Sequence, residues 1–143
     1  MKTTFTAVLV TALATLPAAV MADFYLYDGY QTTPDGDDMI ITRVTSQGDK
    51  GDCDGIDNSP ELDGADGEYS YPWPEESFTS KDPLCDVTLR FEKDGDNYKA
   101  YDDATGEEVA SCTEGSNETT PCFWGFISAE YNEAYYCESS VCA

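Results

Sequence analysis

The chain has 143 residues, of which 7 are Lys or Arg, 29 are Asp or Glu and none is His, giving a formal net charge of −22 at pH 7. This charge excludes nucleic-acid binding through phosphate neutralisation and disfavours the adsorption of a cationic amphipathic toxin to membranes. Without His the chain has no Ser-His-Asp triad and no Cys-His pair. Because of the strong negative charge we expect no nucleic-acid partner.

The first 22 residues have the pattern of a secretory signal peptide. Lys2 gives a positive start, residues 7–16 are mostly apolar, Pro17 interrupts the segment, and Ala22 is a small residue suited to cleavage before Asp23. The apolar stretch is too short to span a membrane, and no later stretch approaches the length of a span. We expect residues 1–22 to be removed and residues 23–143 to form a single secreted domain.

Beyond the signal peptide, in chain order, alternating aromatic and aliphatic residues predict a first strand over 23–27, and β-branched residues predict a second over 39–45. Residues 46–83 are rich in Asp, Glu, Gly and Pro and predict a long acidic loop, whose aromatic side chains either fold back as a lid on the core or form an exposed recognition patch.

An antiparallel meander is predicted from Cys85 to Cys112. In residues 86–92 every second residue is apolar, which is typical of a strand with one buried face. Turns at 93–97 and 103–106 separate this strand from two further strands, over 98–102 and 107–112.

After a polar loop, the apolar run over 122–127 predicts a buried strand, and residues 128–136 fit a helix or a strand equally. The predicted fold is mainly β: a small disulfide-stapled antiparallel sheet or sandwich with at most one short helix.

Six cysteines follow the signal peptide, and an even number in this context predicts three disulfides. They are Cys53, Cys85, Cys112, Cys122, Cys137 and Cys142. Their spacing contains no CxxC pair, which argues against a zinc site. The meander places Cys85 and Cys112 at opposite ends of a sheet, too far apart for a disulfide. Among the remaining pairings we favour Cys112–Cys122.

The acidic string around Cys53 partly resembles a calcium-binding loop. Asp52, Asp54, Gly55 and Glu61 have the spacing of an EF-hand, but Lys50 occupies the position of the first anionic ligand. We therefore predict no metal site and no cofactor, although weak calcium binding by the acidic turns stays open. Carboxylate pairs can hydrolyse glycosides, but nothing in the sequence selects a pair, so we assign no catalytic residue.

Two further features concern sugars. Asn117 begins an Asn-Glu-Thr sequon in a polar segment and is a predicted N-glycosylation site. Aromatic side chains can stack on sugars or pack in the core, and we expect most to do the latter. The aromatic residues considered are Tyr25, Tyr27, Trp73, Trp124, Tyr135 and Tyr136.

The short signal peptide, the aromatic start at residues 23–27, the β-rich body and the six dispersed cysteines resemble small secreted cysteine-rich proteins of filamentous fungi, many of them effector candidates. The resemblance covers residues 23–143 and concerns the architecture, not a motif. It implies a secreted, non-enzymatic interaction protein acting on a host or extracellular protein or glycan. Two alternatives stay open: a carbohydrate-binding or toxin-like antagonistic module, and a small acid-active hydrolase.

Overall fold

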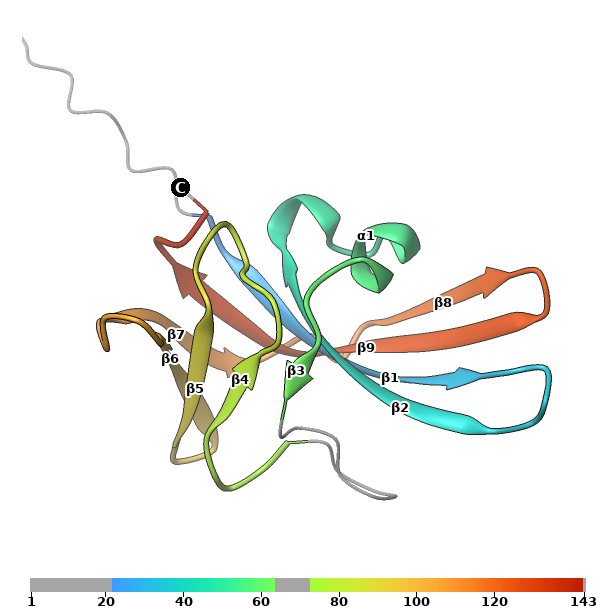
Figure 1. The fold of residues 1–143 in the computed structure, drawn as a ribbon, viewed down its shortest axis with the longest axis horizontal. Helices are drawn as coiled ribbons and strands as arrows, with labels where there is room; N and C mark the ends of the chain where they lie inside the picture. The colour runs from blue at the N-terminus through green and yellow to red at the C-terminus, as the bar shows by residue number, and fades with distance from the viewer. Residues whose placement is uncertain (1–21, 64–72, 143) are drawn as a thin grey trace, which may run out of the picture.

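A computed structural model describes residues 22–63 and 73–142, and within them one antiparallel sheet of nine strands dominates (Figure 1). The strands are β1 (Phe24–Thr32), β2 (Asp38–Ser46), β3 (Leu62–Asp63), β4 (Phe78–Ser80), β5 (Leu89–Asp94), β6 (Asn97–Asp102), β7 (Glu108–Glu114), β8 (Thr119–Trp124) and β9 (Ile127–Ser139). The described helices are the 3-10 turn η1 (Gln47–Asp49) and the short helix α1 (Cys53–Asp57). The mainly-β prediction is confirmed.

The sheet curls into a near-barrel because its two ends approach each other. The strand order is β2-β1-β9-β7-β6-β5-β4-β3, and β8 pairs with residues 127–132 of β9, along the same edge whose residues 135–139 pair with β7. On the far side of β2, the N–H of Val44 donates to the carbonyl of Pro60 at 3.0 Å, and Arg43 forms an isolated bridge with Glu61 just before β3. These contacts bring the β2 end of the sheet next to the segment that leads into β3, at the other end of the sheet.

An aromatic core fills the near-barrel. Phe24 and Leu26 of β1 are fully buried there, and Phe78 of β4 stacks on Phe91 of β5 with ring centroids 4.9 Å apart. Phe24 meets Phe91 edge-on at 6.3 Å. Such ring pairs add to the stabilisation that comes from removing their apolar surface from water.

A second apolar cluster lies on the opposite face of β1 and β9, beneath α1. Tyr27, Tyr131 and Ile56 are almost fully buried in it. Gly29 makes the close approach of β1 and β9 possible, because a Cβ atom there would lie 2.8 Å from the Tyr131 ring.

Beyond the near-barrel, β1, β2, β8 and β9 continue as a four-stranded projection ending in two hairpin turns (Figure 1). We call residues 28–42 and 119–132 the arm. Side chains alternate along its strands, so that one face packs toward α1 and the other, which we call the open face, is not covered by α1.

The three disulfides join Cys53 to Cys122, Cys85 to Cys142, and Cys112 to Cys137. The exclusion of Cys85–Cys112 is confirmed. The favoured pairing of Cys112 with Cys122 is wrong, because Cys112 on β7 lies directly opposite Cys137 on β9. Cys122 faces the other side and ties β8 to α1.

The predicted meander is confirmed, with β5, β6 and β7 as its strands. Leu89 and Phe91 are buried, as the alternation predicts. The first strand begins later than expected because Cys85 and Asp86 have left-handed backbone conformations, with φ of 49° and 68°, in a tight turn closed by Leu84 and Val87.

The predicted single buried strand over 122–127 is wrong, since the segment is a hairpin: β8 ends at Trp124, Gly125 and Phe126 form the turn, and β9 begins at Ile127. Gly125 has a φ of 61°, and glycine is preferred at this position of a two-residue hairpin turn. The ambiguous stretch over 128–136 is entirely strand.

The predicted acidic loop over 46–83 is only partly irregular, because it contains η1, α1, β3 and β4. Its residues 64–72 lie outside the described residues, as do residues 1–21 of the predicted signal peptide. In the part of the chain that the structure describes, no helix is long and apolar enough to cross a membrane.

Candidate functional site

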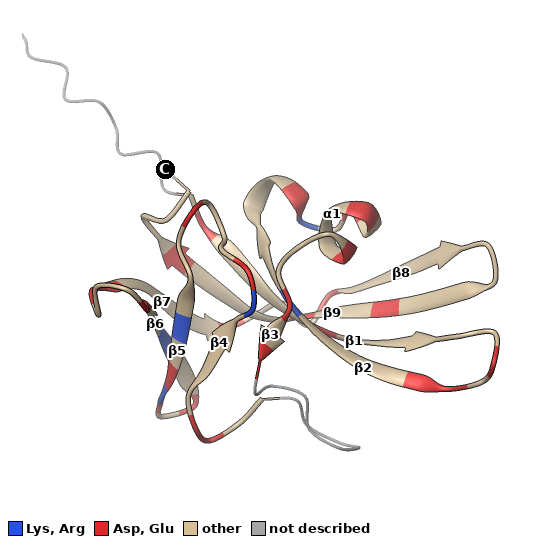
Figure 2. Ribbon diagram, viewed as in Figure 1, with Lys and Arg blue, Asp and Glu red and all other residues tan. Residues whose placement is uncertain are grey.

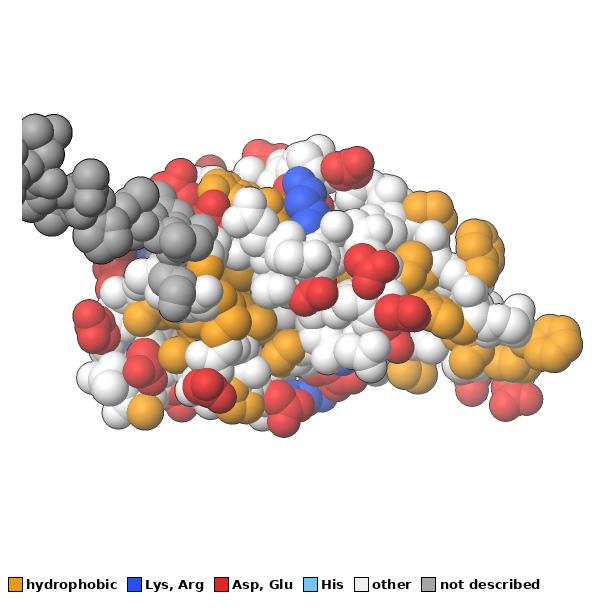
Figure 3. All heavy atoms as spheres, turned by 90° about the horizontal axis from the view of Figure 1, so that it is seen from above, with side chains coloured by type: hydrophobic (Ala, Val, Ile, Leu, Met, Phe, Trp, Pro, Cys, Tyr) orange, Lys and Arg blue, Asp and Glu red, His pale blue; other side chains and the backbone are white. Residues whose placement is uncertain are grey.

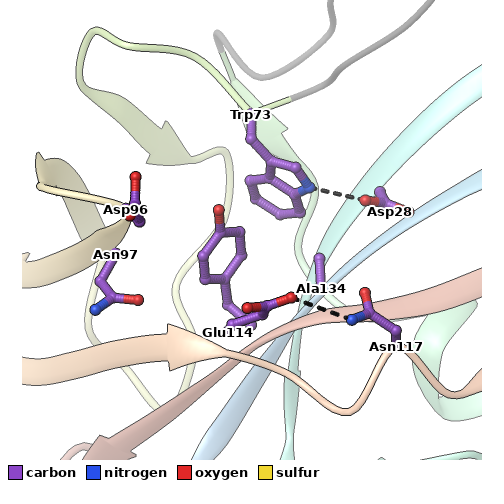
Figure 4. A pocket seen from close by; sticks show the side chains of 8 residues that line it. Asp28, Trp73, Asp96, Asn97, Glu114, Asn117 and Ala134 are labelled. Carbon is purple, nitrogen blue, oxygen red and sulfur yellow. Dashed lines mark hydrogen bonds between the residues drawn. The ribbon is translucent and has the colours of Figure 1, made fainter.

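The first candidate region is a pocket of about 170 Å³ at one end of the near-barrel, which we call the mouth pocket (Figure 4). It is lined by Asp28, Trp73, Asp96, Asn97, Glu114, Asn117, Ala134 and Tyr135. These residues come from β1, the segment before β4, the β5–β6 hairpin, β7 and its following loop, and β9.

Trp73 forms one wall of the mouth pocket and is firmly held. Its indole Nε1 donates to Asp28 Oδ2 at 2.8 Å, and Asp28 Oδ1 accepts from Asn132 Nδ2 at 3.2 Å. The indole meets the Tyr135 ring edge-on at 5.2 Å and is only 7% exposed. Both oxygens of Asp28 therefore have protein partners, and Trp73 exposes little of its ring to a ligand.

The rim of the mouth pocket is polar. Asn117 Nδ2 donates to Glu114 Oε1 at 3.4 Å, and both side chains are exposed. Asn117 has a φ of 57°, which asparagine tolerates better than most residues. Asn117 is well placed to carry a glycan, and its glycosylation stays a prediction. The mixture of amides, carboxylates and ring edges suits hydrogen bonding to hydroxyl or amino groups.

Glu133 supports the loop that carries Asn117. Glu133 is 3% exposed, and its carboxylate forms an ion pair with Lys50 Nζ at 2.8 Å and accepts from the Ser116 N–H at 3.1 Å. Burial by itself raises the pKa of Glu133, but the hydrogen bonds from Lys50 and Ser116 outweigh it and lower the pKa below the ordinary value. Glu133 is thus a structural anion.

Two aspartates of the EF-hand-like string accept hydrogen bonds from protein groups. Asp52 caps α1 by accepting from the Gly55 N–H at 2.8 Å, and Asp54 Oδ1 accepts from Trp124 Nε1 at 2.9 Å. Across residues 22–63 and 73–142, no group of three Cys, Asp or Glu side chains is arranged to hold a metal ion. The two aspartates fasten the short helix and its neighbour β8 instead.

The second region is the arm, whose surface is apolar. All the large hydrophobic side chains that are exposed among the described residues lie on it: Tyr30 at 53%, Met39 at 50%, Phe123 at 77% and Phe126 at 92%. Figure 3 shows hydrophobic side chains gathered at this end of the molecule. On the open face a groove of about 280 Å³ is lined by Tyr30, Thr32, Pro121, Phe123, Ser128, Ala129 and Glu130.

All the charged side chains of the arm are acidic. It contains Asp28, Asp35, Asp37, Asp38 and Glu130, and neither of its two segments contains Lys or Arg. Figure 2 shows acidic but no basic positions along the projecting part of these strands. A surface that combines exposed aromatic rings with uncompensated carboxylates suits a partner that is both apolar and cationic.

The aromatic residues considered from the sequence lie mostly in the interior. Tyr25, Tyr27 and Trp73 are buried, and the other three are partly buried. The sequence reasoning missed the exposed rings of Tyr30, Phe123 and Phe126. The signal for the last two was the glycine between Trp124 and Phe126, which allows a hairpin turn in an otherwise apolar run.

Comparisons with models of known protein families, with curated proteins and with solved structures found no match to this chain.

Proposed function

We propose that this protein is a secreted, non-enzymatic interaction protein that binds an extracellular protein through the arm. The observation that carries the proposal is the concentration of exposed large hydrophobic side chains there, while the near-barrel buries its own. Exposed rings grouped on one projection are costly in water unless a partner covers them, and such patches commonly mark protein contacts.

Features outside the arm favour the interpretation that the molecule is a rigid scaffold for binding. Three disulfides fasten α1 to β8, the C-terminal segment to the turn before β5, and β7 to β9. Disulfides are typical of proteins that work outside the cell. The best-placed carboxylate of the mouth pocket, Asp28, is held by Trp73 and Asn132, which favours a structural role over an acid–base one.

A capture experiment tests this function. The disulfide-bonded protein is immobilised, exposed to extracellular fluid, and its bound proteins are identified by mass spectrometry. The double variant Phe123→Ser/Phe126→Ser should lose partners that the unmodified protein retains. The variant Asp94→Asn, changed at an exposed site at the end of β5, should retain them. Equal capture by the unmodified protein and the arm variant would contradict the proposal.

A second candidate function is carbohydrate binding at the mouth pocket, which the aromatic wall and the amide and carboxylate rim favour. A glycan array distinguishes the two. Binding that is lost in Asn97→Ala and Glu114→Gln, but kept in the arm variant, would assign glycan recognition to this pocket.

A further inference from the structure

We infer that the groove on the open face of the arm receives an arginine side chain of the partner protein, with its guanidinium at Glu130 and against the rings of Tyr30 and Phe123. The inference rests on the proposed function, because it names the chemistry of the partner that the arm would bind.

The strand register places a carboxylate between two aromatic rings. Tyr30 on β1 is the direct cross-strand partner of Glu130 on β9, and Glu130 is in turn opposite Pro121 on β8. Phe123 is two residues further along β8 and projects from the same face. Direct cross-strand neighbours and their diagonals lie within reach of aromatic and long side chains. All four residues line the same groove.

The Glu130 carboxylate is available to a ligand. It is exposed, and it makes no hydrogen bond or ion pair with any residue in the described ranges. The neighbouring rings are also available, since Tyr30 is 53% and Phe123 is 77% exposed. The groove therefore offers an anionic acceptor flanked by ring surfaces that nothing in the described structure covers.

A guanidinium group matches this combination better than other side chains. It donates two parallel hydrogen bonds to a carboxylate, and its planar, weakly hydrated face stacks on aromatic rings. A lysine ammonium is a compact, strongly hydrated point charge that gains less from ring stacking. The absence of Lys and Arg from both segments of the arm means that an incoming cation meets no like charge there.

The free edges of the arm disfavour the addition of a partner strand. β8 carries Pro121, which has no N–H to donate, and the exposed part of β2 begins at Asp38. Proline and charge at an edge protect it from strand pairing. The partner is therefore expected to contact the open face through side chains.

Peptide titration followed by ¹H–¹⁵N NMR tests the inference. The probes are a short peptide of alternating arginine and threonine and two twins in which every arginine is replaced by lysine or by citrulline, the neutral isostere of arginine. The arginine peptide should shift the amide signals of β1, β8 and β9 around the groove. The lysine peptide should bind more weakly than the arginine peptide. The citrulline peptide should bind at least about tenfold more weakly than the arginine peptide.

Matched variants separate the groove from the overall negative charge. Glu130→Gln and Phe123→Ser should each lower the affinity for the arginine peptide by about tenfold. Asp94→Asn removes the same charge from another exposed site and should change the affinity by less than about twofold. The three side chains are exposed, so the NMR spectrum of each variant should show an unchanged fold.

Each outcome decides something. If citrulline or lysine binds at the arm as tightly as arginine, or if Glu130→Gln has no more effect than Asp94→Asn, the arginine assignment is wrong while the arm remains a binding surface. If no peptide shifts the arm but Phe123→Ser/Phe126→Ser still loses captured proteins, the partner has another chemistry and the proposed function stands. If neither experiment depends on the arm, both proposals fail.

Discussion

The ion pair between Glu133 and Lys50 allows the sharpest test of how this acidic protein is stabilised. Glu133 is 3% exposed, lies 2.8 Å from Lys50 Nζ and accepts from the Ser116 N–H, whereas the Lys50 side chain is 36% exposed. Glu133→Gln keeps the shape but removes the charge. A hydrogen bond to a charged group contributes about 1.5–3 kcal/mol, and the partial exposure of Lys50 places the loss near about 2 kcal/mol.

For a chain of this size that loss corresponds to a melting temperature lower by roughly 5–10 °C at pH 7, measured by circular dichroism with the disulfides intact. Glu138→Gln, at an exposed position on the same strand, is the matched control and should change the melting temperature little. A double-mutant cycle with Lys50→Met should recover about 1–2 kcal/mol of coupling.

The pH dependence tests the electrostatic origin of the effect. Because the folded-state pKa of Glu133 lies below the ordinary value of 4.5, its contribution is fully present above that value and is lost as pH falls through the folded pKa. The stability difference between the unmodified protein and Glu133→Gln should therefore shrink in acid. If the difference stays constant through this range, or if Glu138→Gln is equally destabilised at pH 7, the electrostatic reasoning is wrong.

Further predictions concern the disulfides, the core and the net charge. Replacing both Cys53 and Cys122 by Ala opens a link with a sequence separation of 69 and should lower the free energy of unfolding by about 4 kcal/mol, measured by urea denaturation. Thr45→Val should raise it by about 1 kcal/mol, because the buried Thr45 hydroxyl has no hydrogen-bond partner among the described residues; a loss of stability would show that the hydroxyl is satisfied. Gly29→Ala should lower the free energy of unfolding by about 1–3 kcal/mol, since the new Cβ would lie 2.4 Å from the backbone oxygen of Glu130. At pH 8 the melting temperature should rise as salt is raised from about 10 to 200 mM, because screening relieves the repulsion implied by a net charge of −22; an unchanged value would contradict this.

Local patterns in the sequence were sufficient to predict the local features of the fold. Alternation in residues 86–92, together with glycine and aspartate in the turns, determined the meander, since strand period and turn preference depend on neighbouring residues alone. The meander then excluded Cys85–Cys112, because strand length sets the distance between its ends. The class of the fold followed from the number of such segments.

Which surfaces are buried and which distant residues meet depends on how the strands are arranged in three dimensions. The apolar run over 122–127 has the composition of a core strand, but β8 and β9 extend beyond the near-barrel, so that Phe123 has no layer packed above it and is 77% exposed. Cys112 pairs with Cys137 because β7 lies beside β9, a neighbourhood that no local pattern encodes. The groove at Glu130 has the same origin, because strands from opposite ends of the chain bring Tyr30 and Phe123 to its two sides. Sequence periodicity predicts which face of a sheet a residue lies on, but not which residues are its neighbours on adjacent strands.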